Sequence, residues 1–369
     1  MTDKQLKVAI VCDWLTGYGG AERVVYELHQ LYPDAPIYTS QYDPSKIDWF
    51  NDADIRTTWL QKLPKSLKKF LPALRAISFS RLDLSEYDLV ISSSGAEAKG
   101  VHTGPNTTHI CYCHSPTHYY WVRYDEYLKN PGFPKGLNWL AKIGLRILVG
   151  PLRSWDHRAA QKPNYIIANS THTQKMIQKF YGRESTVIFP PVETDRFKLP
   201  AKQGLRHGFV VAGRQTPYKR FDLAITACNE LKVPLVVIGD GPDHKRLEKL
   251  AGRSVTFLSN VNDNDMAGHF QSALGVIMPN MDDFGIVAVE ALASGTPVIA
   301  YKAGGSLDYL NPPNNGVYFN EQTPESLQAA LEQVMSKSFN YESVAKSAQK
   351  FSVASFSKNI KEFIAKKTI

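Results

Sequence analysis

Short apolar stretches rich in β-branched residues alternate with segments of helical periodicity along most of the chain. In the first half, this pattern predicts strands over Val8–Trp14, Pro36–Thr39, Tyr87–Ser93, Thr108–Cys113, Tyr165–Asn169 and Thr186–Phe189, and a helix over Ala21–Leu31. In the second half, it predicts strands over Phe209–Gly213, Leu235–Gly239, Val255–Leu258, Gly275–Met278 and Pro297–Tyr301. The helices expected there are Phe221–Leu231, His244–Ala251, Asp263–Ser272, Ile286–Ala293 and Pro324–Ser336. Such alternation is typical of parallel sheets that helices cover on both faces.

A polar, proline-rich stretch interrupts this alternation between residues 190 and 204, and the pattern restarts after it. The 369 residues suit two domains better than one. We therefore expect an α/β protein with two Rossmann-like domains, residues 1–195 and 205–352, that face each other across a cleft. In such sheets, ligands bind at the carboxyl ends of the strands.

Composition narrows the class of protein. Hydrophobic residues make up 43% and charged residues 21%, which excludes a mostly disordered chain. No apolar run reaches the roughly 18 residues that a membrane span needs. The first residues do not resemble a secretory signal, and four cysteines do not make a disulfide framework at this length, so we expect a cytoplasmic location.

The net charge of +8 is concentrated in segments. Seven basic residues and no acidic one lie between Asp54 and Asp83, and five basic residues and no acidic one lie between Glu126 and Asp156. Within these stretches, residues 59–79 and 133–155 combine apolar with basic positions, and Pro64 and Pro72 should divide the first into short helices. Their apolar faces either pack into the protein or lie on an anionic membrane surface. Nucleic acid is not expected, because neither segment has a recognised nucleic-acid motif.

A glycine-rich loop, Asp13–Arg23, joins the first strand to the first helix. Backbone N–H groups at such a helix N-terminus suit a phosphate. Glu22 stands where a third glycine of the dinucleotide-binding fingerprint would be, which disfavours a nicotinamide enzyme. The alternative to a phosphate-binding role is that the glycines serve only to form a tight turn.

His114 and two cationic side chains are further candidates. His114 ends the run Cys111–His114, but no second cluster has zinc-site spacing, so we expect no metal. Because His114 follows a predicted strand, its side chain can reach the cleft. Arg214 and Lys219 lie between a strand and a helix, where they could converge on a diphosphate or simply face water.

Acidic residues surround the start of the predicted helix over residues 286–293. Asp282 stands just before the helix, as a ligand-facing carboxylate or as an N-cap. Glu290 lies two turns in, among apolar neighbours, and a carboxylate there needs a partner. Ribose or sugar hydroxyls would serve as that partner, as would a nearby Lys or Arg.

Together these stretches resemble retaining glycosyltransferases of family 4, and the resemblance covers nearly the whole chain. It rests on four motifs in order: Gly19–Glu22, His114–Pro116, Arg214 with Lys219, and Asp282 with Glu290. The family implies the two-domain GT-B fold, with an acceptor-side first domain and a nucleotide-sugar-binding second domain. It also implies a C-terminal helix, within residues 353–369, that crosses back to the first domain.

The resemblance assigns a role to each matching residue. Gly19 and Gly20 would lie by the donor diphosphate, His114 near the transferred sugar, and Arg214 and Lys219 on the diphosphate. Asp282 stands where the family usually has Glu, near the sugar hydroxyls, and the adjacent Asp283 could replace it there. Glu290 would hold the ribose. Backbone N–H groups of four residues would face sugar and phosphate: Phe284, Gly285, Ile286 and Val287.

The resemblance further implies a metal-independent, cofactor-free hexosyl transfer. The loops resemble those of bacterial mannosyltransferases, so GDP-mannose is the favoured donor. A lipid-linked or surface-glycan acceptor is expected, with the enzyme peripheral on the inner face of the cell membrane through residues 59–79 and 133–155. The alternatives are a UDP-sugar-dependent enzyme, an epimerase or phosphorylase of the same fold, and a non-catalytic nucleotide-sugar-binding subunit of a membrane glycan assembly.

Overall fold

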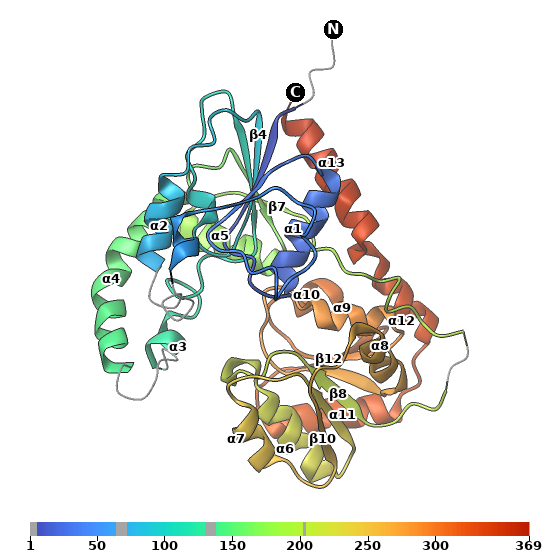
Figure 1. Cartoon of the computed structure of the whole chain (residues 1–369). Helices are drawn as coiled ribbons and strands as arrows, with labels where there is room; N and C mark the ends of the chain where they lie inside the picture. The colour runs from blue at the N-terminus through green and yellow to red at the C-terminus, as the bar shows by residue number, and fades with distance from the viewer. Residues whose placement is uncertain (1–5, 64–71, 130–137, 202–203, 369) are drawn as a thin grey trace. The chain divides into compact units, whose positions relative to one another are not determined.

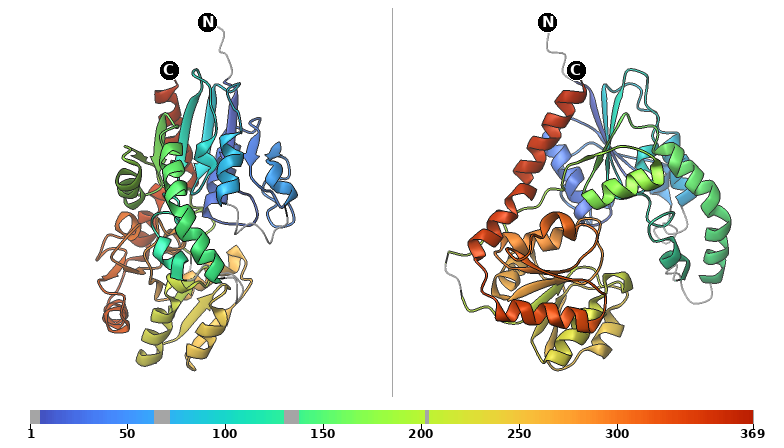
Figure 2. Two further views of the ribbon diagram at one scale, coloured as in Figure 1. Left: turned by 90° about the vertical axis from the view of Figure 1, so that its left-hand side faces the viewer. Right: turned by 180° about the vertical axis from the view of Figure 1, so that it is seen from behind.

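The computed structural model describes residues 6–63, 72–129, 138–201 and 204–368. The chain divides into two compact units: residues 1–189 with 357–369, and residues 190–356. Figures 1 and 2 show both units, and each is described here by itself.

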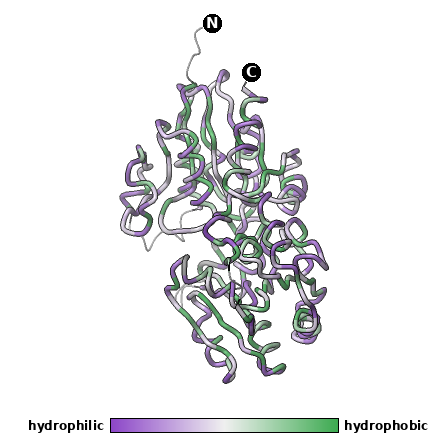
Figure 3. The backbone as a smooth tube through the Cα atoms, turned by 90° about the vertical axis from the view of Figure 1, so that its right-hand side faces the viewer, coloured by the Kyte–Doolittle hydropathy of each residue, from purple (hydrophilic) through white to green (hydrophobic). Residues whose placement is uncertain are grey.

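Unit 1 is built on a seven-stranded parallel sheet in the order β3-β2-β1-β4-β5-β6-β7. Its central strands are buried along their whole length because helices cover both faces of a parallel sheet. Figure 3 shows such strands as hydrophobic stretches of the backbone. The strands are β1 (Val8–Cys12), β2 (Ile37–Thr39), β3 (Ile55–Thr57), β4 (Leu89–Ser94), β5 (Thr108–Cys113), β6 (Tyr165–Ala168) and β7 (Thr186–Val187).

The helices of unit 1 differ in how they begin and end. Ser170 caps α5 by accepting from the Thr173 N–H, and Gly182 ends that helix in the left-handed region. The helices are α1 (Gly20–Leu31), η1 (Trp59–Lys62), α2 (Pro72–Ser80), η3 (Ala98–Gly100), α3 (Tyr124–Lys129), α4 (Asn138–Ala159) and α5 (Thr171–Tyr181). The last part of α13 (Val353–Lys367) also belongs to this unit, where Phe363 and Lys367 pack on the Tyr165 ring.

Unit 2 has a six-stranded parallel sheet in the order β10-β9-β8-β11-β12-β13. Its strands are β8 (Phe209–Ala212), β9 (Leu235–Ile238), β10 (Val255–Leu258), β11 (Gly275–Met278), β12 (Val298–Tyr301) and β13 (Gly316–Phe319). Its helices are η4 (Pro217–Lys219), α6 (Phe221–Leu231), α7 (His244–Leu250), α8 (Asp263–Ser272), α9 (Ile286–Ala293), α10 (Ser306–Tyr309), α11 (Pro324–Ser336), α12 (Tyr341–Ser347) and η5 (Gln349–Phe351). One apolar core joins α6 and α11 to the sheet.

The expected class, α/β with two Rossmann-like units, is confirmed. The strands and helices expected from the sequence are present within a few residues, while β3, β13, α3, α5, α10, α12 and the short helices η3, η4 and η5 are additional. Pro72 begins α2, as expected for a proline that divides helices, whereas Pro151 lies inside α4. Residues 64–71 and 130–137 of the two basic segments lie outside the described residues.

The four cysteines are all free and buried. Burial raises the pKa of each thiol, most clearly for Cys12 and Cys113 on strands β1 and β5. They therefore behave as small core side chains.

Candidate functional site

A pocket of about 400 Å³ opens in unit 1 where strands β1, β4 and β5 end. Polar side chains, among them Asp13, Glu22 and His114, line it together with the aromatic rings of Trp14, Tyr119 and Tyr127. Carboxyl strand ends of a parallel sheet meet at one edge, so residues distant in sequence come together here. This combination of carboxylates, imidazoles and aromatic faces suits a polyhydroxylated ligand.

Asp13, the first residue after β1, is fixed at the wall of this pocket. Its carboxylate accepts backbone N–H bonds from Gly95 (2.8 Å), Ala96 (3.0 Å) and Ala98 (2.8 Å). Burial, followed by the charge of Glu97, raises the pKa of Asp13, and the backbone hydrogen bonds oppose that shift. The side chain therefore locks the segment after β4 onto β1.

Gly19 and Gly20 form the start of α1, with Gly19 as the N-cap and Gly20 on the pocket wall. A Cβ at Gly19 would lie 2.6 Å from Oε2 of Glu22, so the glycine leaves room for that carboxylate to fold back on the helix N-terminus. Burial raises the pKa of Glu22 to about 7. Glu22 can therefore change its charge near neutral pH.

His114 follows β5 and lines the same pocket, as expected for a residue at a strand end. Its Nε2 lies 2.7 Å from Oγ of Ser93, and its carbonyl accepts from the Asn169 side-chain amide at 2.9 Å. The Tyr112 ring packs beside the imidazole. These contacts hold the imidazole at the pocket and give it a hydroxyl partner for proton exchange.

In unit 2, Lys219 and Asp282 form an ion pair. The Lys219 ammonium lies 2.7 Å from each oxygen of Asp282, and the side-chain amide of Asn280 donates to Oδ1 at 2.7 Å. The side chains of Lys219 and Asp282 are 21% and 15% exposed, so solvent and a ligand can reach the pair. Of the two adjacent acids, Asp282 is the one that the structure brings to Lys219.

Arg214 follows β8 and is exposed, so its guanidinium is accessible to an anionic ligand. The structure brings Lys219, but not Arg214, into contact with Asp282. Between Lys219 and α6, Arg220 adopts the left-handed region (φ 54°), which separates η4 from α6 and fixes where Lys219 points.

The segment before α9 is shaped for backbone contacts. Phe284 is buried against Tyr309 and Phe351, so its main chain rather than its ring is available to a ligand. Gly285 has φ 101°, a conformation that favours glycine. Ile286 and Val287 then open α9, where the first N–H groups of a helix lack intrahelical acceptors. Glu290 is half-buried further along α9.

Two glycines of the neighbouring loop hold this segment in place. The Gly305 N–H donates to the Asp282 carbonyl at 2.9 Å. A Cβ on Gly304 would come within 2.3 Å of that same carbonyl oxygen, and one on Gly305 within 2.3 Å of the Phe284 carbonyl oxygen. The close approach of the two backbones therefore sets the position of Asp282.

Sequence reasoning assigned no role to Asp13, Ser93 or Asn280. Asp13 and Ser93 lie at the carboxyl ends of β1 and β4, which is the signal that could have found them. Asn280 comes two residues after β11, so the same signal applies to it, but its hydrogen bond to Asp282 is seen only in the folded loop.

The basic segments show two different outcomes. In α2, Ala76 and Phe79 are buried, as expected for an inward-facing helix. Of the two alternatives for the second segment, inward packing does not hold in the first half of α4, because five large apolar side chains there are 44–67% exposed: Trp139, Leu140, Ile143, Ile147 and Leu148. The second half of α4 packs inward through Leu152, Asp156 and Ala159.

Across the residues that the structure describes, no group of three or more His, Cys, Asp or Glu side chains is arranged to hold a metal ion. None of the helices over that part of the chain has the length and apolar character needed to span a bilayer.

Two family models match consecutive parts of the chain. Glycosyltransferase Family 4 matches residues 18–196, and Glycosyl transferases group 1 matches residues 192–351. The two models meet close to the boundary between the two units.

Curated relatives are similar over part of their length. An uncharacterized glycosyltransferase of Methanocaldococcus jannaschii is 31% identical over 134 residues, 34% of this chain and 34% of that protein. A GDP-mannose-dependent alpha-(1-6)-phosphatidylinositol monomannoside mannosyltransferase of Mycobacterium tuberculosis is 26% identical over 213 residues, 50% of this chain and 55% of that protein. The chain thus spans about a third to about a half of the length of these relatives.

Among solved structures, Anabaena HepE in complex with UDP and glucose superposes with a TM-score of 0.67 at 19% identity. The match covers 98% of this chain and 100% of HepE, and it establishes the shared fold. With the two family models in chain order, this chain belongs to the glycosyltransferases of the GT-B fold, with a Family 4 domain followed by a group 1 domain.

Proposed function

We propose that this chain transfers a hexose, with retention of configuration, from a nucleotide-diphosphate sugar to a lipid-linked or surface-glycan acceptor, without a metal or other cofactor. The observation that carries the proposal is the Lys219–Asp282–Asn280 cluster on unit 2. A lysine held beside a carboxylate, with an exposed Arg214 on the same unit, combines the cation that a diphosphate needs with an acceptor for sugar hydroxyls.

GDP-mannose is the donor that we favour. The mycobacterial relative is named for a GDP-mannose-dependent reaction, whereas the HepE structure holds UDP and glucose. The loops around Gly19 and Lys219 are similar to those of mannosyltransferases. A uridine-based donor is the alternative within the same chemistry.

In the proposed reaction, an acceptor hydroxyl oxygen bonds to the anomeric carbon while the bond from that carbon to the diphosphate oxygen breaks. Lys219 and Arg214 offset the charge that develops on the departing diphosphate. The proton of the acceptor hydroxyl passes to the departing phosphate. Asp282 orients the sugar, Glu290 holds the ribose, and backbone N–H groups of residues 284–287 contact sugar and phosphate. In this proposal, His114 lies near the transferred sugar, and Gly19 and Gly20 lie by the donor diphosphate.

A thermal-shift panel tests the donor class. The ligands are GDP-mannose, UDP-glucose, UDP-N-acetylglucosamine, GDP and UDP, and a ligand at about 100 times its Kd stabilises by about 2.7 kcal/mol. We expect a shift with the guanosine ligands that Lys219→Ala removes and the exposed-surface control Lys245→Ala retains. A shift with uridine ligands alone would reassign the donor. Binding without turnover for any acceptor would support a non-catalytic subunit.

We further propose that the exposed apolar side chains of α4 lie on an anionic membrane surface on the cytoplasmic side. Trp139, Ile143 and Ile147 recur at helical spacing, and Lys142 and Arg146 lie beside them, which suits lipid tails and anionic head groups together. Figures 1 and 2 show α4 at the outer side of unit 1.

Flotation with vesicles of phosphatidylglycerol tests this placement. The triple variant W139S/I143S/I147S should lose most of the binding, whereas Leu205→Ser, which removes a fully exposed apolar side chain from unit 2, should keep it. Absence of vesicle binding by the unmodified chain, or equal binding by the triple variant, would contradict the proposal.

A further inference from the structure

The short segment after β4, residues 95–99, is attached to two different helices by buried charges. Glu97 is 0% exposed and Lys99 is 2% exposed; they stand two residues apart, Glu97 just before η3 and Lys99 within it. Buried charges require partners, and each of these has a different one. We call residues 95–99 the junction segment.

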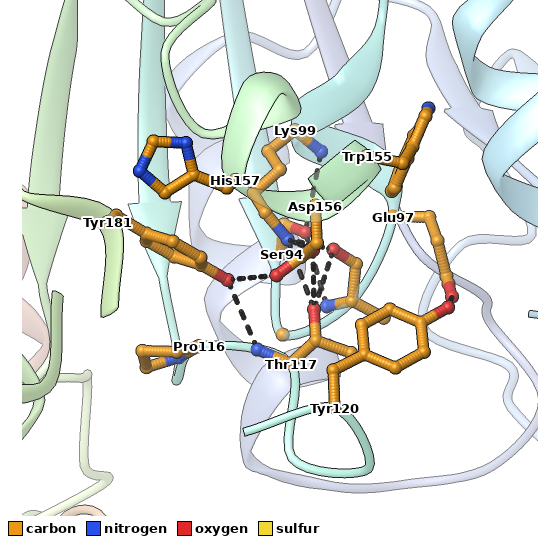
Figure 4. Close-up of polar contacts among 12 residues, drawn as sticks. Ser94, Glu97, Lys99, Pro116, Thr117, Tyr120, Trp155, Asp156, His157 and Tyr181 are labelled. Carbon is orange, nitrogen blue, oxygen red and sulfur yellow. Dashed lines mark hydrogen bonds and ion pairs between the residues drawn. The ribbon is translucent and has the colours of Figure 1, made fainter. Parts of the chain in front are cut away.

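Lys99 ties the junction segment to α4. Its ammonium lies 2.6 Å from Oδ1 of Asp156, a residue of α4 that is 0% exposed. Burial alone would lower the pKa of Lys99, but the charge of Asp156 reverses this and the net shift is upward, so the lysine stays charged. Figure 4 shows the two side chains directed at each other.

Asp156 is saturated with donors, which fixes its position. In addition to Lys99, it accepts from the Thr117 hydroxyl (2.8 Å), the Trp121 indole (2.8 Å) and the Tyr181 hydroxyl (2.7 Å). Thr117 stands three residues after His114, so the same carboxylate also holds the strand end that carries the pocket imidazole. Figure 4 shows Thr117 and Tyr181 converging on Asp156.

Glu97 ties the junction segment to α2. Its carboxylate accepts from Nε of Arg75, a residue of α2, at 2.8 Å, and from the Tyr119 hydroxyl. The Arg75 guanidinium also lies 5.1 Å from the centre of the Trp14 ring. Trp14 and Tyr119 both line the pocket of unit 1. Both basic amphipathic helices therefore reach the pocket through one short segment.

The junction segment in turn holds Asp13. Its amides at residues 95, 96 and 98 donate to the Asp13 carboxylate, and the Lys99 ammonium donates to the Ala96 carbonyl. A displacement of α2 or α4 would move Glu97 or Lys99, and with them the amides that hold Asp13. Closely packed, fully bonded interiors transmit such displacements rather than absorb them.

We propose that Glu97 and Lys99 are positioning residues through which the placement of α2 and α4 sets the geometry of the unit 1 pocket. This rests on the proposed function, in which that pocket serves glycosyl transfer and α4 lies on a membrane. Seating α4 on lipid then orders the pocket at the surface where the acceptor is found. Membrane binding of the chain thereby affects the geometry of its unit 1 pocket.

Hydrogen exchange of the backbone amides, with and without phosphatidylglycerol vesicles, tests the proposal. In the unmodified chain, vesicles should protect peptides of α4 and also slow exchange in peptides spanning residues 94–99. Lys99→Met should leave α4 protected but abolish the vesicle effect at residues 94–99. Without vesicles, it should speed exchange there by about tenfold.

Controls separate positioning from simple destabilisation. Arg183→Met removes a cation that bonds carbonyls just beyond the end of α4, at Ala160 and Pro163, so it should destabilise unit 1 without changing residues 94–99 selectively. Arg75→Met should speed exchange at residues 94–99. Arg75→Lys, which keeps the positive charge, should return that exchange toward the rate of the unmodified chain. Affinity for GDP and UDP, measured by calorimetry, should stay within about twofold in the Lys99 and Arg75 variants, since Lys219 and Asp282 belong to unit 2.

The results of these experiments separate a failure of the positioning role from a failure of the proposed function. If α4 gains no protection from vesicles, membrane docking is wrong, and the vesicle-free comparison of Lys99→Met with Arg183→Met decides the positioning role. Unchanged exchange at residues 94–99 in Lys99→Met, or an equal change in Arg183→Met, overturns the inference. Loss of GDP and UDP binding in the unmodified chain would overturn the proposed donor chemistry instead.

Discussion

Two aspartates that follow strands, one in each unit, are held in opposite ways. Asp13 is buried and bonded to three backbone amides, whereas Asp282 is partly exposed and bonded to the side-chain ends of Lys219 and Asn280. Backbone donors cannot leave without unfolding the loop, but a lysine can exchange a carboxylate for a phosphate. The comparison indicates a fixed frame in unit 1 and an exchangeable, charge-paired site in unit 2.

The largest expected effect is on the stability of unit 1. Asp13→Ala should lower the free energy of unfolding by at least about 3 kcal/mol, because buried N–H groups lose their acceptor. Asp282→Ala should cost less than about 1 kcal/mol, because water can reach Lys219, whose side chain is 21% exposed. Thermal and denaturant unfolding measure both. Equal losses would remove the distinction between the two aspartates.

Lys219→Ala should lower kcat about 100-fold, the scale of a lost charge-stabilising donor, while the melting temperature changes by less than about 2 °C. Steady-state rates with the donor found in the thermal-shift panel measure this, and Lys245→Ala on α7 is the control. An unchanged rate would take Lys219 out of the chemistry.

Asp282→Asn should affect binding and turnover in opposite directions. Freed from its carboxylate, Lys219 should bind GDP or UDP roughly threefold to fivefold more tightly, on the scale of a partly exposed ion pair. Turnover should fall because the sugar loses a charged acceptor. Calorimetry with the nucleoside diphosphates checks the first expectation, and weaker binding would show that Asp282 does not compete for the lysine.

The smallest expected effect concerns pH. The pKa of Glu22 is raised to about 7 from the ordinary value of 4.5, so between these values the folded chain holds a proton that the unfolded chain has released. Glu22 therefore contributes stability at low pH that is lost as pH rises toward 7. Glu22→Gln should be more stable than the unmodified chain at pH 8, by about 2 °C in melting temperature, with little difference at pH 4.5.

Most strands of the two sheets were predictable, because parallel strands buried on both faces appear in the sequence as continuous apolar runs. The strands that escaped prediction, β3 and β13, both lie at sheet edges, and β3, with no buried residue, lacks the continuous apolar run of the central strands. Periodicity predicted that α4 is amphipathic and left open whether its apolar side packs inward or faces outward; the structure turns the apolar side of its first half outward. That orientation depends on where Leu152 and Asp156 anchor its second half.

The site was predictable to the extent that topology locates it. His114, Lys219 and Asp282 were found from their places after strands or before helices, and the structure supports those places while their roles remain to be tested. The Asp13 contacts to residues 95–98 were not predictable, since they join positions more than 80 residues apart. Asn280 is close to Asp282 in sequence, but its contact depends on the backbone turn that Gly304 and Gly305 enforce.

The four buried cysteines have a practical consequence for labelling. Their raised thiol pKa values leave almost no thiolate at neutral pH, so maleimide reagents should react slowly with the native fold. A cysteine introduced at Ile147, which is 67% exposed, would then carry a spin label or fluorophore selectively. The label at this position would then report the depth of α4 in a bilayer, in a chain that keeps all its native thiols.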